Sequence, residues 1–155
     1  MRRPPRKPSK QINGPSEVQA VLARGNLLHL AMCQDGQPYV VPMHYGYEQG
    51  RIYLHTGVKG LKMEVLAANP RVSFAVCEGV EFAPAGQPCK WDTRYQSVVG
   101  LGAASLVEDP AEKRAGLKAI ARACGHRDGG EMLEEKVRMV AVLRIDIGHL
   151  SGKRN

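Results

Sequence analysis

Apolar and polar residues alternate through much of this chain, and a period of two is typical of β-strands with one buried face. The pattern predicts strands over residues 27–33, 39–47, 51–56, 71–78, 94–107 and 139–147. In the third of these, Ile52 and Leu54 face opposite to Tyr53 and His55. The second contains Pro42, which removes one ladder hydrogen bond.

Helical signals occupy the segments between some of these strands. A short helix is expected over residues 16–24, capped by Ser16 and stopped by Gly25, and another over 60–68. The sequence Asp109-Pro110-Ala111-Glu112 opens a third, because a capping aspartate, a proline at the first position and a glutamate at the capping-box position agree. A further helical turn is expected near 131–136. A loop rich in Gly and Pro is expected over 79–91.

The order of these elements excludes repeated βαβ units, so a doubly wound parallel sheet is not expected. An antiparallel barrel with helices outside suits the order, because closure removes exposed sheet edges. We therefore predict a mainly β (α+β) fold.

The charge of the chain lies mainly at its ends. Of 22 basic residues, seven lie in the terminal segments, which leaves 15 against 15 acids in the body. The seven are Arg2, Arg3, Arg6, Lys7, Lys10, Lys153 and Arg154. We expect a flexible basic tail over 1–15 and a single domain over 16–155. A basic tail can bind nucleic acid, but the neutral body argues against that function.

No stretch of the sequence has the roughly 18 apolar residues of a membrane helix, and no apolar segment follows the basic start. No membrane partner and a cytoplasmic location are expected. The four cysteines show no C-x-x-C spacing, and only Cys124 and His126 lie close together. We expect reduced thiols and no metal site.

Two segments carry candidate chemistry. In Pro38–Tyr45, the proline suits either a kinked edge strand or a strand whose backbone meets a ligand. In His55–Lys62, a strand ends, glycines loosen the turn, and a helix begins beside Lys59 and Lys62. A helix N-terminus with nearby cations suits a phosphate, although a solvated basic turn is the alternative.

A third segment, Arg94–Gly102, places polar residues at the start of a long strand. These segments belong to three longer runs, PYVVPMHYGY, GRIYLHTGVKGLKMEVLAANPRVSFAV and YQSVVGLGAASLVEDPAEKRAGL, which are followed by a final His149–Lys153. In the order and spacing of these runs, the chain resembles the pyridoxamine 5'-phosphate oxidase-like families in their nitroimidazole-resistance branch. The resemblance covers roughly residues 16–153.

This resemblance implies a six-stranded split β-barrel homodimer with FMN bound at the interface. The backbone of the second strand would lie along the flavin ring. The phosphate would lie where the next strand ends and a helix begins, and polar residues of the long strand would face the flavin. The cofactor-binding residues carried over are Val41, Pro42, Met43, His44, Thr56, Lys59, Gly60, Lys62, Gln96 and Ser97. Leu61 departs from the related oxidases, which have an arginine there.

The resemblance further implies a flavin-dependent reductase of a small electrophile, such as a nitroaromatic or quinone-like compound. His44 is the candidate catalytic residue, because it lies near the predicted ring. The sequence lacks G-x-G-x-x-G, so a nicotinamide donor would bind transiently. A non-catalytic flavin or haem module of the same fold is the alternative, and deazaflavin is another cofactor of such barrels.

Overall fold

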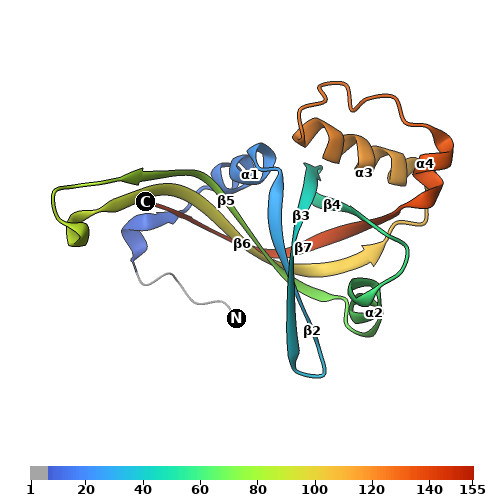
Figure 1. Ribbon diagram of the computed structural model, residues 1–155, viewed down its shortest axis with the longest axis horizontal. Helices are drawn as coiled ribbons and strands as arrows, with labels where there is room; N and C mark the ends of the chain where they lie inside the picture. Colours follow the sequence, from blue (N-terminus) through green and yellow to red (C-terminus); the bar gives the residue numbers. More distant parts are fainter. Residues whose placement is uncertain (1–6) are drawn as a thin grey trace.

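A computed structural model describes residues 7–155 of the chain (Figure 1). Its strands are β1 (Gln11–Ile12), β2 (Leu27–Gln34), β3 (Gln37–Glu48), β4 (Arg51–Thr56), β5 (Arg71–Ala83), β6 (Asp92–Leu106) and β7 (Ala141–Arg154). Its helices are α1 (Pro15–Arg24), α2 (Leu61–Ala68), α3 (Pro110–Ala123) and α4 (Glu134–Met139), with single turns η1 (Pro8–Lys10) and η2 (Pro88–Lys90). Each strand and helix expected from the sequence is present; β4 has its predicted bounds, and those of the others differ.

The strands form a ring. Their order is β1-β7-β4-β3-β2-β5-β6, and a further pairing of β6 with β7 closes it. All neighbouring pairs are antiparallel. Six strands, β2 to β7, make the ring, while β1 is added to the end of β7. The predicted six-stranded antiparallel barrel with flanking helices is confirmed.

The ring is split beside β3. This strand pairs with β2 from Gln37 to His44, but with β4 only from Tyr45 to Glu48. The hairpin of β2 and β3 therefore extends past the ring at the bottom of Figure 1. Within the described residues, one backbone edge of 37–44 has no strand partner. Pro42 lies in this half-paired part of the strand, where proline is tolerated.

The barrel interior is filled by apolar side chains from every strand of the ring and from α1. Its largest fully buried side chains are Tyr45, Phe74, Leu22, Leu28, Leu30, Ile52, Leu54, Leu143 and Ile145. Tyr45 donates its hydroxyl hydrogen to the Leu22 carbonyl at 2.7 Å, which ties β3 to the end of α1. Burial raises the pKa of this phenol well above its ordinary value, so it remains a donor.

Helix α3 packs on the outside of the barrel over β3 and β4 (Figure 1). Its predicted cap is confirmed, because the Asp109 carboxylate accepts from the Glu112 amide at 2.7 Å. The Glu112 carboxylate accepts from the Tyr53 hydroxyl and the Arg144 guanidinium. Close packing requires Gly46, where a Cβ would lie 2.4 Å from the Ala119 carbonyl carbon.

The predicted loop over 79–91 is wrong. Strand β5 continues to Ala83 and β6 begins at Asp92, so only 84–91 connect them. We call residues 79–95 the arm, which extends away from the ring in Figure 1. The pairing passes an irregularity and resumes at Glu81 with Arg94, and this cross-strand pairing holds the segment extended despite its glycines. Strand β7 likewise passes its predicted end at 147, because β6 pairs with it as far as Arg154.

The predicted tail over 1–15 is too long. Gln11 and Ile12 pair with the end of β7, and Ile12 is only 3 % exposed. Residues 1–6 of that predicted tail lie outside the described residues. The prediction that Ser16 caps α1 is wrong, because Ser16 lies inside the helix and no side chain caps it. The helix begins one residue earlier, because Pro15 supplies the fixed φ that suits its first position and Gly14 stands at the cap.

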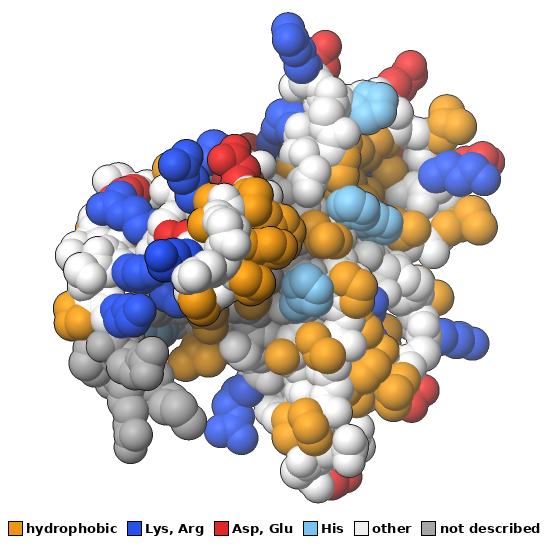
Figure 2. All heavy atoms as spheres, turned by 60° about the vertical axis from the view of Figure 1, so that its left-hand side comes forward, with side chains coloured by type: hydrophobic (Ala, Val, Ile, Leu, Met, Phe, Trp, Pro, Cys, Tyr) orange, Lys and Arg blue, Asp and Glu red, His pale blue; other side chains and the backbone are white. Residues whose placement is uncertain are grey.

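Pairing of β1 with β7 also brings the basic ends of the chain together. Gln11 lies opposite Lys153, the Lys153 ammonium lies 5.3 Å from the Tyr95 ring centre, and Arg154 pairs with Glu17. Figure 2 shows Lys and Arg side chains gathered on the side of the molecule that carries the arm. Among the described residues, basic side chains from the two ends of the chain therefore lie on one side of the fold.

Candidate functional site

The four residues predicted to lie along a flavin ring occupy the open edge of β3. Met43 points into the barrel and is 8 % exposed, while Pro42 and His44 point outward. Val41 is half-buried and packs against the core. Because β4 does not pair with this stretch, its backbone groups can meet a planar ligand instead of a strand.

The outward imidazole of His44 is held by the turn between α1 and β2. Its Nδ1 lies 3.1 Å from the Asn26 carbonyl oxygen, and the same oxygen accepts from the Tyr45 amide. A carbonyl only accepts, so Nδ1 carries a hydrogen. Nε2 is then the ring atom available to exchange a proton with a ligand.

Lys62 reaches the same edge from α2. Its Nζ lies 3.4 Å from the Met43 Sδ, which joins the predicted phosphate site to the predicted ring site. Partial burial lowers the pKa of the Lys62 amine below its ordinary value, because desolvation disfavours the charged form. A desolvated ammonium of this kind is stabilised by an incoming anion.

The start of α2 supplies backbone donors beside Lys62. Gly60, with φ of +120°, stands at the N-cap, and no side chain caps the helix. Its carbonyl accepts from the Met63 and Glu64 amides, while the first amides of a helix have no partner within the helix. Such amides suit an anion.

The other two residues predicted for the phosphate lie just before α2. Thr56 ends β4 opposite Ala141, and Lys59 is exposed in the turn that follows.

The two polar residues predicted on the long strand point to opposite faces of the sheet. Ser97 lies opposite Cys77 and Lys153, with its neighbour Gln96 on the other face. Gln96 Oε1 accepts from Arg24 Nη2 at 2.7 Å. Both remain predicted flavin contacts, but the fold presents them in different directions.

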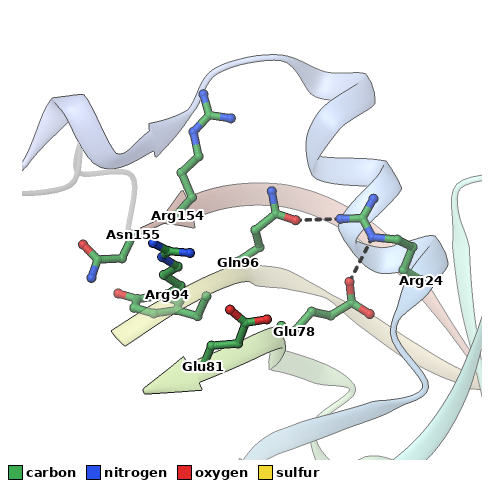
Figure 3. Close-up of a pocket in the computed structure, with 9 residues that line it drawn as sticks. Arg24, Glu78, Glu81, Arg94, Gln96, Arg154 and Asn155 are labelled. Atoms are coloured by element: carbon green, nitrogen blue, oxygen red, sulfur yellow. Dashed lines mark hydrogen bonds and ion pairs between the residues drawn. The ribbon is translucent and has the colours of Figure 1, made fainter. Parts of the chain in front are cut away.

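Gln96 borders a polar hollow at the base of the arm, drawn in Figure 3. The hollow measures about 330 Å³. Its labelled residues are Arg24, Glu78, Glu81, Arg94, Gln96, Arg154 and Asn155. They come from α1, β5, β6 and the end of the chain. The turn that follows Arg24 also holds His44, so α1 connects this hollow to the open edge of β3.

Sequence reasoning did not find Arg24, Asn26 or Glu78. Arg24 ends a helix, where a cation ordinarily complements the helix dipole in solvent. Asn26 contributes only its backbone carbonyl, which no residue pattern reveals. Their roles follow from contacts across 18 to 72 positions of sequence.

A second hollow, of about 390 Å³, lies between β4 and the α3–α4 region. Its walls are largely apolar and include Leu117, Met132 and Val137, with His55 and Lys136 at its sides. His55 therefore faces a different space from the β3 edge. None of the residues predicted for the flavin lines this hollow.

The donor set of the site fits FMN. A flavin ring offers carbonyl oxygens and N–H groups along its edge, which match a free strand edge and an amide side chain. Its phosphate is an anion, which matches the Lys62 ammonium and the free amides that open α2.

Two further findings bear on the class of protein. No helix in residues 7–155 is long and apolar enough to cross a membrane. In the same residues, no group of three or more His, Cys, Asp or Glu side chains is placed so that it could hold a metal ion.

Comparison with known families gives a match over nearly the whole chain. The profile of the family described as Pyridoxamine 5'-phosphate oxidase matches residues 15–154. Uncharacterized protein RA0666 of Rhizobium meliloti (strain 1021) is 40% identical over 62 residues, a segment that spans two fifths of either chain.

Solved structures share the fold. A candidate 5-nitroimidazole antibiotic resistance protein from Bacteroides thetaiotaomicron is 29% identical with a TM-score of 0.80, covering 93% of this chain and 86% of that one. An FAD-binding protein from Mesorhizobium loti is 28% identical with a TM-score of 0.71, covering 94% and 97%. An FAD- and haem-binding protein from Mycobacterium smegmatis, 19% identical with a TM-score of 0.80 over 94% and 73%, shares the fold.

Proposed function

Since the chain belongs to the pyridoxamine 5'-phosphate oxidase family, we propose that it binds FMN and acts as a flavin-dependent reductase of a small electrophile, such as a nitroaromatic or quinone-like compound. The observation that carries the proposal is the open edge of β3, with Lys62 and the start of α2 beside it. This arrangement offers backbone to a flat ring and a cation to a phosphate. A cytoplasmic location suits it, because reduced nicotinamide and similar donors occur there.

FMN explains the site better than a ligand without phosphate. Haem would need an axial ligand, and His44 Nε2 is available for that role while Nδ1 donates to the Asn26 carbonyl, so a haem titration has to test this cofactor directly. A terminal phosphate would give the Lys62 amine, which lies at the open edge beside Met43, an anionic partner. A deazaflavin with a phosphate would use the same donors, so direct titration has to choose between them.

The chain's own residues would hold and cover the cofactor. The β3 backbone would lie along the ring, Lys62 would bind the phosphate, and His44 Nε2 would exchange a proton with the substrate. When bound, FMN supplies the electron transfer that no side chain of the protein can provide.

We further propose that the protein is a homodimer with the flavin at the interface. One outward row of side chains crosses five strands in register: Pro42, His29, Ala75, Val99 and Ser151. The row is poor in charge, Val99 is 48 % exposed, and the adjacent Leu27 is 43 % exposed. A second copy on this face would bury these side chains and cover the outward side of the β3 edge.

Light scattering tests the dimer. The expected mass is twice the 16.9 kDa of one chain. Val99→Asp should shift the protein toward monomer, because it places a charge within the proposed interface. Leu133→Asp, at a side chain that is 61 % exposed away from this row, is the matched control. A monomeric wild type at all concentrations would exclude the dimer.

Titration of the purified protein with FMN, FAD, a phosphorylated deazaflavin, riboflavin and haem tests the cofactor. We expect FMN to bind most tightly and to give a flavin absorption spectrum. Reduction of a nitroaromatic by the FMN complex with a reduced nicotinamide then separates a reductase from a flavin-binding module without catalysis. A Soret band with no flavin binding would overturn the proposed cofactor.

A further inference from the structure

We propose that Arg24 is a positioning residue, which orients the Gln96 amide so that its nitrogen donates to a carbonyl oxygen of the flavin ring. The inference rests on the proposed FMN site, because it assigns Gln96 to the ring. Gln96 is the predicted flavin contact whose orientation is set by a neighbouring charged side chain. Figure 3 shows the contact between the two residues.

The amide orientation follows from the chemistry of its partner. Arg24 Nη2 lies 2.7 Å from Gln96 Oε1. A guanidinium has five donors and no acceptor, so only the amide oxygen can face it. The Gln96 Nε2 is therefore directed away from Arg24, and it makes no hydrogen bond to any residue of 7–155. One face of the amide is fixed, and its donating group is left for a ligand.

Arg24 is itself held in place. Its Nε donates to Glu78 Oε2 at 3.2 Å, and the Glu78 side chain is only 19 % exposed. Glu78 lies directly opposite Gln96 in the pairing of β5 with β6. The guanidinium thus bridges two neighbouring strands from the end of α1, with its own side chain 54 % exposed.

A fixed donor selects one kind of group on the flavin. The pyrimidine edge of the ring carries two carbonyl oxygens and one N–H between them. A freely rotating glutamine serves either kind of group, whereas Gln96 held by Arg24 serves only a carbonyl. These oxygens gain negative charge when the ring is reduced, so a donor aimed at them also favours the reduced flavin.

A double-mutant cycle tests the proposal. The variants are Arg24→Met, Gln96→Ala and the two combined, each titrated with FMN and with riboflavin. We expect each single variant to weaken both ligands by on the order of tenfold, the scale of one hydrogen bond. The combined variant should be no weaker than Gln96→Ala, because Arg24 acts through Gln96. The midpoint potential of bound FMN should fall in all three.

Two further variants separate this role from a merely structural one. Arg94→Met removes another cation of the same hollow that has no hydrogen bond to Gln96, and it should retain wild-type affinity. Gln96→Glu keeps an acceptor facing Arg24 and loses the donor. It should therefore weaken flavin binding while its melting temperature stays at or above that of the wild type.

Unchanged flavin affinity in Arg24→Met, or an additive loss in the combined variant, would overturn the inference. If Lys62→Ala weakened FMN selectively while Arg24→Met had no effect, the proposed FMN site would stand and the role of Arg24 would fall alone. If the wild type bound no flavin, the proposed function would fail, and this inference with it.

Discussion

Lys62 joins the two halves of the candidate site, because its amine contacts Met43 on the open strand edge while its backbone lies in the first turn of α2. Lys62→Ala should weaken FMN binding by roughly 1.5–3 kcal/mol, the usual worth of a hydrogen bond to a charged group. This corresponds to about one to two decades in dissociation constant.

Riboflavin provides the control for Lys62, since it lacks the phosphate. Its affinity should be nearly unchanged in Lys62→Ala, and fluorescence titration measures both ligands. Lys59→Ala should cost less than Lys62→Ala, because Lys59 is exposed in the turn. Equal weakening of FMN and riboflavin in Lys62→Ala would show that the lysine supports the fold instead of the phosphate.

The lowered pKa of Lys62 predicts a pH dependence of FMN binding. Burial favours the neutral amine in the free protein, whereas the phosphate favours the charged one. FMN affinity should therefore fall as the pH rises through the lowered pKa of Lys62, and riboflavin affinity should not follow it. Titrations across the alkaline range test this. An unchanged alkaline decrease in Lys62→Ala would assign it to another group.

At the scale of elements, the two helix starts offer a matched comparison. Asp109 caps α3 through its carboxylate, while Ser16 makes no capping hydrogen bond in α1. Asp109→Ala should lower the free energy of unfolding by about 1 kcal/mol. Ser16→Ala should change it by less than about 0.5 kcal/mol, as is usual for an exposed residue.

Urea unfolding of both variants measures these free energies, provided that the transition is two-state. A loss in Ser16→Ala as large as that in Asp109→Ala would contradict the cap assignment at α1. The comparison matters for the site because α1 carries Arg24 and ends at the turn that holds His44. A displaced α1 would therefore change flavin affinity as well as stability.

At the scale of the whole molecule, the N-terminal segment belongs to the fold from β1 onward. Ile12 is buried against Val18 and pairs at Gly152, so it connects the start of the chain to α1 and β7. A chain lacking residues 1–12 should therefore be less stable than one lacking 1–6, by about 2 kcal/mol for the lost isoleucine.

Thermal unfolding of the two truncated chains measures this difference. The shorter deletion is the control, because it keeps β1. Equal melting temperatures would show that β1 contributes nothing to stability, and that the fold in effect begins at α1.

The sequence by itself determined the elements and their capping chemistry. Alternation in 51–56 predicts that Ile52 and Leu54 share one buried face, although α3 also buries Tyr53 on the other face, and the residues around Asp109 predict how a helix begins. Both signals act over a few residues, so they can be recognised without the fold. The resemblance to relatives supplied Lys62 and the β3 residues as candidates, and the structure places Lys62 beside Met43.

Only the tertiary structure decided how far the strands extend and which groups meet. The arm stays extended because β5 and β6 pair past their glycines, and Ile12 is buried because β7 offers it a partner. The open edge of β3 exists because β4 turns away after Leu54. The contact between Arg24 and Gln96 joins residues 72 positions apart. Each of these depends on a distant partner, and local periodicity carries no information about which partner a strand edge or a charged side chain will meet.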